Sequence, residues 1–159
     1  MEVYLLRHGI AEERGGSIAD RSRALTPQGR RKLESVLRRA RKAKVSPTLI
    51  LSSPFRRAFQ SAEVAAELLG YHGTITKTAA LQPGSSAEAV WREVSKHASE
   101  PAILLCGHEP LLGEVFSYLL GADRALVDLR KGALGRIDVE PAAGKPRGRL
   151  RWLLTAGVS

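Results

Sequence analysis

The sequence has few of the features that would place a protein in a membrane or in an export pathway. It contains a single cysteine, Cys106, which allows no internal disulfide and fits a reducing compartment such as the cytoplasm. No stretch of about 18 uncharged apolar residues occurs, so we expect no membrane-spanning segment. The first residues lack a basic region and a small-residue cleavage site, and we therefore expect them to belong to the fold rather than to a secretion signal.

Several enzyme motifs are missing as well. A cysteine-based phosphatase needs an arginine six residues after its cysteine, but Leu112 occupies that position after Cys106. The absence of a Gly-x-Ser-x-Gly motif and of a P-loop argues against a serine hydrolase and against a P-loop nucleoside triphosphatase. No His-x3–5-His or Cys-x2-Cys pair occurs, so we expect no zinc site and no other metal or cofactor.

The sequence does have an excess of positive charge on a chain of ordinary composition. Its 159 residues include 25 Lys and Arg against 16 Asp and Glu, which gives a formal net charge of +9. The length is that of one domain, predicted over 1–159. The charge favours anionic partners, whether phosphates, acidic proteins or nucleic acid, and does not choose among them.

Short apolar runs alternate with longer segments of helical periodicity. Strands are predicted over 3–6, 48–51, 75–79, 102–106, 133–139 and 149–155. One helix is predicted to begin at 27, a second to end at about 69, and two more to span 87–97 and 110–120. This alternation predicts an α/β fold, a three-layer sandwich with a mostly parallel central sheet, helices on both faces and antiparallel C-terminal edge strands.

Three of the predicted strands end in residues that suit an anion. The segments are 7–9 (Arg-His-Gly), 52–57 (Ser-Ser-Pro-Phe-Arg-Arg) and 107–110 (Gly-His-Glu-Pro). The carboxyl ends of parallel strands meet at one edge of a sheet, so these segments are expected to converge. An arginine binds phosphate oxygens through paired hydrogen bonds. A histidine among arginines loses its proton more readily, and the neutral imidazole is a competent nucleophile. The pattern predicts phosphoryl transfer through a phosphorylated histidine.

Each segment alone has an ordinary structural explanation. An Arg-His-Gly triplet usually marks a loop, and a Gly-His pair after a strand usually marks a turn whose imidazole has a partner. Three such segments at one predicted edge favour the functional interpretation. The other two histidines, His72 and His97, lie near a loop and a helix end, and we expect them on the solvated surface.

Taken together, these segments resemble the histidine phosphatase superfamily, which includes phosphoglycerate mutase and acid phosphatases. Residues 7–9 match its Arg-His-Gly signature, and 25–29 (Leu-Thr-Pro-Gln-Gly) resemble its Leu-Thr-x-x-Gly helix start. Residues 53–61 resemble its Ser-Pro-x-x-Arg-Ala-x-Gln-Thr segment, with Ser61 in place of Thr, and 107–108 match its second histidine. The short length and the Arg-His-Gly-x-Ala opening are most similar to the small SixA-type phosphohistidine phosphatases.

The resemblance implies a catalytic role for four residues. His8 would accept the phosphoryl group, and Arg7 and Arg57 would hold its oxygens. His108 would donate a hydrogen bond as an imidazolium. Arg57 falls at the arginine position of the superfamily, so Arg56 is expected to be a surface or substrate-docking residue.

One departure from the superfamily pattern bears on the substrate. Larger members carry a Glu or Asp general acid between the third strand and the next helix, whereas this chain has Gln82 within Ala-Leu-Gln-Pro-Gly. Hydrolysis of ordinary phosphomonoesters is therefore doubtful. Phosphohistidine fits, because an imidazole with a reference pKa of about 6.5 leaves without a placed acid, and the SixA-type proteins also lack that carboxylate. Gly9 and Glu109 complete the predicted substrate-binding residues, with phosphate or sulfate as the simplest ligand.

We therefore expect a cytoplasmic, metal-independent phosphatase that acts on phosphohistidine in a protein, such as a histidine kinase domain or a phosphocarrier. The alternative within enzymes is a small-molecule phosphomonoester phosphatase in which Glu12, Glu13, Glu88 or Glu109 serves as the acid.

A third hypothesis belongs to another class, a basic binding module for an acidic protein or nucleic acid. It rests on a run of cations in the first predicted helix: Arg30, Arg31, Lys32, Arg38, Arg39, Arg41, Lys42 and Lys44. Few aromatics interleave with this run, so a solvated helix face is the preferred interpretation and nucleic acid is not expected. A docking surface for an acidic phosphocarrier or kinase domain stays open.

Overall fold

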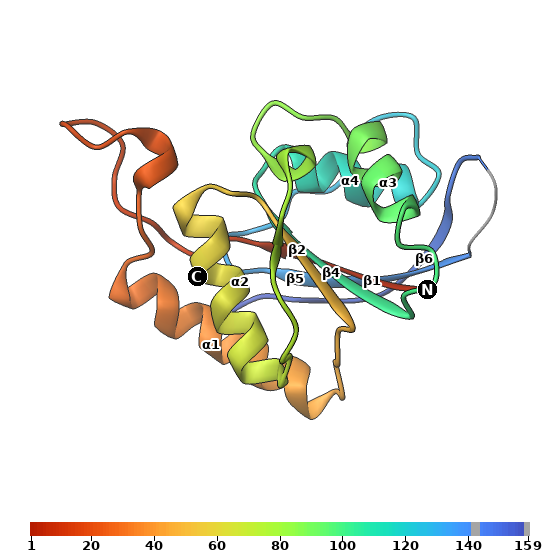
Figure 1. Cartoon of the computed structure of the whole chain (residues 1–159), viewed down its shortest axis with the longest axis horizontal. Helices are drawn as coiled ribbons and strands as arrows, with labels where there is room; N and C mark the ends of the chain where they lie inside the picture. Colours follow the sequence, from red (N-terminus) through yellow and green to blue (C-terminus); the bar gives the residue numbers. More distant parts are fainter. Residues whose placement is uncertain (141–143, 158–159) are drawn as a thin grey trace.

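The computed structural model describes residues 1–140 and 144–157, and its centre is one mixed β-sheet (Figure 1). The strands are β1 (Glu2–Arg7), β2 (Leu49–Ser52), β3 (Thr76–Lys77), β4 (Ala102–Gly107), β5 (Leu134–Glu140) and β6 (Arg147–Leu154). The α-helices are α1 (Pro27–Lys42), α2 (Arg56–Leu69), α3 (Ala87–Ser95) and α4 (Leu111–Leu119), and the short 3-10 helices are η1 (Asp20–Ser22) and η2 (Ala79–Leu81).

The strand order is β3-β2-β4-β1-β5-β6. The first four strands in this order are parallel, and β5 and β6 add an antiparallel edge. Helices α1 and α2 cover one face of the sheet, and α3 and α4 cover the other (Figure 1). The predicted α/β sandwich with antiparallel C-terminal strands is confirmed.

The central strands form because they have no polar face. Every residue of β4 is buried, and Val3 to Leu6 of β1 are buried on both faces, as expected for strands covered by helices on each side. Cys106 lies at the end of β4 and is fully buried, with its Sγ donating to the Ala58 carbonyl of α2 at 3.1 Å. The apolar clusters on the two faces therefore fix where the strand ends lie.

The start of α1 is held against the residues that follow β1. Thr26 caps the helix by accepting a hydrogen bond from the Gly29 amide at 2.9 Å, and Pro27 occupies the first turn. The Thr26 amide donates to the Ile10 carbonyl at 2.9 Å. A Cβ on Gly29 would stand 2.2 Å from that carbonyl oxygen, so only glycine allows this approach.

Some element boundaries differ from the predictions. The third strand is two residues long, because the chain turns into η2 directly after it. Helix α3 ends at Ser95, and β6 begins at Arg147. The predicted turn between the last two strands includes 141–143, which lie outside the described residues.

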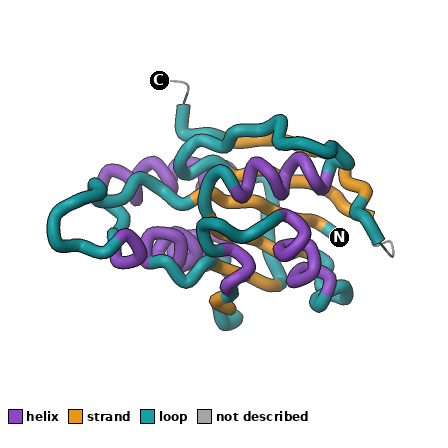
Figure 2. The backbone as a smooth tube through the Cα atoms, turned by 90° about the horizontal axis from the view of Figure 1, so that it is seen from above, coloured by secondary structure: helices purple, strands orange, loops and turns teal. Residues whose placement is uncertain are grey.

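A long loop between β1 and α1 projects beyond the carboxyl ends of the parallel strands (Figures 1 and 2). It is tied back at its base, where Ala11 and Leu25 form a β-bridge. In the described part of the chain no helix is long and apolar enough to cross a membrane.

Candidate active site

The register of β1 and β4 brings the two motif histidines together. Arg7 pairs with Gly107 at the ends of these strands, and His8 and His108 follow directly. The His8 amide donates to the Gly107 carbonyl at 3.1 Å, and the two imidazole centroids are 5.2 Å apart. Because β2 lies on the other side of β4, the segment 53–57 reaches the same edge. The three predicted strand ends thus converge.

His8 is held in one tautomer. Its Nδ1 lies 2.7 Å from the Gly9 carbonyl oxygen, which can only accept, so Nδ1 carries the proton. The lone pair is therefore on Nε2, where it accepts a hydrogen bond from Arg57 Nε at 3.4 Å. Burial lowers the pKa of His8 to about 3, and the charges of Arg57, Arg7 and Lys131 act in the same direction. At neutral pH the imidazole is uncharged and its Nε2 is nucleophilic.

Arg57 is buried at the start of α2, with 3 % of its surface exposed. Its Nη1 donates to the Asp20 backbone carbonyl at 2.8 Å, and its Nη2 lies 3.4 Å from the Asp20 carboxylate. The guanidinium also lies 5.3 Å from the centre of the Phe55 ring. These contacts hold Nε towards His8. Arg56 is exposed and bonds weakly to the Ser22 carbonyl at 3.5 Å, which places it away from the histidines.

His108 is buried, and burial favours its uncharged form; the imidazolium expected from the sequence concerns a bound phosphoryl group and stays a prediction. Its Nε2 lies 2.8 Å from Ser53 Oγ. The Ser53 oxygen also accepts a hydrogen bond from the Phe55 amide at 3.2 Å, and among the described residues His108 Nε2 is the acceptor within reach of the Ser53 hydroxyl, which favours the tautomer of His108 with its proton on Nδ1. Burial lowers the pKa of His108 to about 3, with His8 and Arg57 adding to the effect. Nδ1 is buried and has no partner among the described residues, so a neutral His108 has a donor to offer.

Arg7 provides a second buried donor without a partner among the described residues, after His108 Nδ1. Its Nη1 donates to the Leu129 carbonyl at 2.7 Å, while its buried Nε has no partner in the described chain. Burial lowers the pKa of Arg7, and the charges of Glu109 and Asp128 oppose that shift. An anion that accepted from Arg7 and His108 would satisfy both buried donors.

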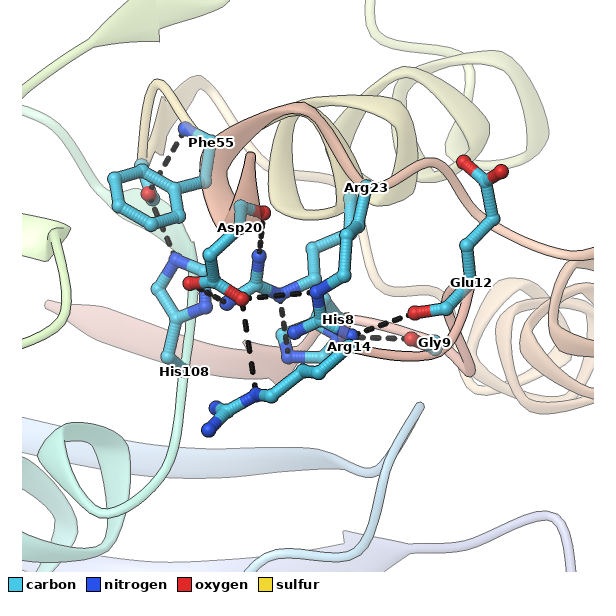
Figure 3. A network of polar contacts seen from close by, with 10 residues as sticks. His8, Gly9, Glu12, Arg14, Asp20, Arg23, Phe55 and His108 are labelled. Atoms are coloured by element: carbon cyan, nitrogen blue, oxygen red, sulfur yellow. Dashed lines mark hydrogen bonds and ion pairs between the residues drawn. The ribbon is translucent and has the colours of Figure 1, made fainter. Parts of the chain in front are cut away.

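These side chains line a cavity of about 530 Å³. Its other lining residues include Ile10, Ala11, Glu12, Glu13, Arg14, Asp20, Arg23, Pro83, Glu109 and Lys131. Figure 3 shows Asp20, Arg14 and Arg23 from the long loop gathered beside His8 and His108. The cavity is therefore polar and carries both signs of charge.

The two acidic neighbours closest to the arginines behave differently. Burial would raise the pKa of Asp20, but the hydrogen bond from Arg23 and the charges of Arg57 and Arg14 outweigh it and the net shift is downward. Burial raises the pKa of Glu109. Glu109 lines the cavity, and its carboxylate accepts from the Gly113 amide at 2.7 Å, which anchors it to the start of α4. The neighbouring arginines thus favour the charged form of Asp20 beside Arg57.

Three other predicted residues take different positions. Gly9 is not among the cavity-lining residues: its carbonyl holds His8 Nδ1, and its amide donates to Ser61 Oγ at 3.1 Å. Gln82 caps η2 and the next residue, Pro83, reaches the cavity. Glu88 lies in the first turn of α3 and does not line it.

The sequence reasoning missed the loop residues Arg14, Asp20 and Arg23. Their signal was weak, because a polar, Gly-rich loop shows no periodicity. The spacing of Asp20 and Arg23, which form a 2.9 Å ion pair three residues apart just before α1, is the one local pattern that could have found them. Of the remaining histidines, His72 is exposed and His97 is partly buried, 3.9 Å from Glu93. Within 1–140 and 144–157 no group of three or more His, Cys, Asp and Glu is arranged to hold a metal ion.

Sequence comparison places these features in a known family. The family model of the histidine phosphatase superfamily (branch 1) matches residues 3–83. An uncharacterised protein of Picosynechococcus sp. is 36% identical over 115 residues, which cover 72% of this chain and 70% of that protein.

Structural comparison finds the same fold in several solved proteins. The protein histidine phosphatase SixA in complex with tungstate has a TM-score of 0.88 at 22% identity, covering 98% of this chain and 97% of that one. The putative phosphohistidine phosphatase SixA from Agrobacterium tumefaciens has a TM-score of 0.84 at 22% identity, covering 97% of each chain. A mycobacterial glucosyl-3-phosphoglycerate phosphatase with inorganic phosphate has a TM-score of 0.73 at 17% identity, covering 99% of each chain.

Proposed function

The chain belongs to the histidine phosphatase superfamily (branch 1), and from this premise we propose that it is a phosphatase that removes the phosphoryl group from phosphohistidine in a protein. The observation that carries the proposal is the state of His8. It is buried and neutral, its Nδ1 is fixed to the Gly9 carbonyl, and its Nε2 lone pair faces Arg57 Nε at 3.4 Å. An imidazole held this way becomes the nucleophile when Arg57 Nε donates to a phosphoryl oxygen and releases the Nε2 lone pair.

In the first step His8 Nε2 attacks phosphorus. The new N–P bond forms as the bond between phosphorus and the substrate imidazole breaks. The leaving imidazole keeps the electron pair and departs neutral, because its other ring nitrogen has already taken a proton from water. Arg57 Nε turns from His8 Nε2 to a phosphoryl oxygen, and Arg7 Nε and His108 Nδ1, which have no partner among the described residues, donate to the others. Donors already in place at developing charge account for most of the rate in such a transfer.

In the second step water attacks phosphorus on His8. The N–P bond breaks, the electron pair returns to His8 Nε2, and phosphate leaves. The hydrogen bond from Nδ1 to the Gly9 carbonyl keeps the ring in position in both steps. This chemistry uses the chain's own side chains and needs no cofactor.

The leaving group sets the substrate preference. The segment between β3 and α3 contributes Pro83 to the cavity and no carboxylate. An imidazole has a reference pKa of about 6.5 and departs without a placed acid, whereas an alkoxide does not. The anions bound in the solved relatives, tungstate and inorganic phosphate, support a phosphoryl site here. A protein partner and a cytoplasmic location are part of the same proposal.

A substrate panel tests it. Turnover of a phosphohistidine peptide, an aryl phosphate, phosphoserine and a sugar phosphate is measured between pH 5 and 9. The first two should react, and the alkyl phosphates should be slower by about 10²–10⁴-fold, the usual contribution of a general acid.

Brisk hydrolysis of the sugar phosphate would instead favour a small-molecule phosphatase. In that case Glu12, Glu13 and Glu109, which line the cavity, are the candidate acids, and Gln substitution of each in turn would identify the donor. Glu88, outside the cavity, is the matched control.

A further inference from the structure

A second groove opens beside the phosphoryl cavity. Its volume is about 420 Å³, within the range of small-ligand sites. It is lined by Lys32, Arg130 and Lys131, by Arg7 and Ile10, and by the segment 155–157 after β6. Arg7, Ile10 and Lys131 line both hollows, so the groove continues from the site of phosphoryl transfer.

The charge of this groove differs from that of the cavity. Among residues 1–140 and 144–157 no acidic side chain lines it, whereas Glu12, Glu13, Asp20 and Glu109 accompany the cations of the cavity. Among the described residues, Lys32, Arg130 and Lys131 form no ion pair. All three are exposed. The groove therefore presents uncompensated positive charge from two elements, α1 and the turn before β5.

The turn that carries Arg130 and Lys131 is hydrogen-bonded to the carboxyl end of β1. The Gly132 amide lies 3.1 Å from the Arg7 carbonyl and 3.0 Å from the His8 carbonyl, and Arg7 Nη1 donates to the Leu129 carbonyl at 2.7 Å. Gly132 has a φ of 76°, a conformation that glycine adopts without strain. The backbone of Arg130 and Lys131 is therefore held at a set place relative to His8.

The basic run of α1 does not act as one surface. Arg30 and Arg38 pair with Glu34, at 2.9 and 3.3 Å. Arg39 donates to the Thr155 carbonyl at 2.6 Å and so helps place the segment that walls the groove. Lys32 is the member of the run that lines it.

We propose that this groove binds acidic side chains that flank the phosphorylated histidine of the substrate protein. The proposal rests on the proposed function, because it assigns the second part of the same substrate. When the phosphoryl group lies among Arg7, Arg57 and His108, a chain leaving the site past Ile10 enters the groove, where carboxylates meet Lys32, Arg130 and Lys131. Three exposed cations on two elements suit several modest contacts along a polypeptide.

The test uses two phosphohistidine peptides that differ only in their flanks, Glu on one and Gln on the other. The wild-type protein should favour the Glu peptide in kcat/KM by about tenfold, the product of two exposed ion pairs of about threefold each. Lys32→Glu/Arg130→Glu should abolish or invert this preference. The matched control is Arg31→Glu/Lys42→Glu, the same charge change at exposed positions outside the groove. This control variant should keep the preference for the Glu peptide. The preference should also shrink as NaCl rises.

Each contrary outcome has its own meaning. Equal turnover of the two peptides by the wild-type protein overturns the groove proposal and leaves the phosphohistidine activity standing. An equal loss of preference in the control variant also overturns it, because net charge rather than the groove would then be responsible. If neither peptide reacts while an aryl phosphate does, the proposed function fails and the assigned ligand falls with it.

Discussion

Strand ends form one side of the phosphoryl cavity, and a polar loop forms the other. On the strand side His8, Arg57 and His108 are buried, with 6%, 3% and 2% of their surface exposed. On the loop side the Asp20 side chain is 47% exposed and Arg14 is 80% exposed. The two sides touch where Arg57 meets Asp20.

The difference separates two tasks. A nucleophilic imidazole must be kept neutral, and burial on a sheet edge covered by helices does this. Asp20 and Arg14 add charge that solvent screens, so their ion pair is worth about 0–1 kcal/mol. Substitutions on the strand side should therefore lower kcat strongly, and substitutions on the loop side should lower it only slightly.

The largest effect is expected for His8→Ala. Removal of the nucleophile should lower turnover by about 10⁴-fold or more, as for nucleophile knock-outs in other covalent enzymes. Labelled phosphate should be trapped on His8 of the wild-type protein under alkaline conditions, which preserve the N–P bond. Normal turnover in folded His8→Ala, with no label at His8 after any mild quench, would remove the strand side from the chemistry.

Arg57 and Arg56 provide a matched pair on one helix turn. Arg57→Ala should cost about 10²–10³-fold in kcat, the usual loss for a donor at developing charge. Arg56→Ala should change kcat by less than about threefold, because its side chain is exposed and makes one long hydrogen bond. Steady-state kinetics on an aryl phosphate decides, and comparable losses at both positions would show that burial does not mark the catalytic arginine.

The buried histidines should make stability depend on pH. Their pKa values near 3 lie below the value of about 6.5 expected in the unfolded chain, so the unfolded state takes up protons first as the pH falls. The free energy of unfolding should have its full value above about pH 6.5. It should fall as the pH drops towards 3, by up to about 1.4 kcal/mol per pH unit for each histidine.

Urea unfolding between pH 7 and 4.5 in phosphate-free buffer measures this slope. His8→Gln should show a shallower slope than the wild-type protein, because one of the two depressed groups is gone. His72→Gln, at an exposed position, is the control and should leave the slope unchanged. A wild-type slope retained in full by His8→Gln would mean that His8 is not held neutral by the fold.

A small effect is expected on the loop side of the cavity, for Asp20→Asn. Arg57 keeps its 2.8 Å hydrogen bond to the Asp20 backbone carbonyl, so kcat should fall by only about threefold. Inorganic phosphate should inhibit more strongly, because a negative charge beside Arg57 is lost. A fall of a hundredfold, with Glu13→Gln unaffected, would move Asp20 to the catalytic side of the comparison.

The sequence predicted the strand side well, for a physical reason. Buried strands such as 102–106 have a continuous apolar pattern, and parallel strands must bring their carboxyl ends to one edge, so the convergence of 7–9, 53–57 and 107–108 follows from the element order. The capped start of α1 at Thr26 and Pro27 was equally legible.

The loop side could not be read in the same way. Asp20 reaches Arg57 through a fold of the chain between Gly9 and Leu25 that no periodicity encodes. The tautomer of His108 depends on the Ser53 hydroxyl, which follows β2 and contacts Nε2 of the imidazole that follows β4. Such details need the three-dimensional arrangement, because they depend on which donor is already used.

The reactivity of the buried Cys106 thiol can report local opening between β4 and α2. Burial raises its pKa, its Sγ is bonded to the Ala58 carbonyl, and it is the single cysteine of the chain. A thiol-specific reagent can therefore reach one atom, and only after the end of β4 has separated from α2. The rate of modification under native conditions would measure how often the sheet edge that carries His108 comes apart, and a bound phosphate analogue should slow that rate in proportion to its occupancy.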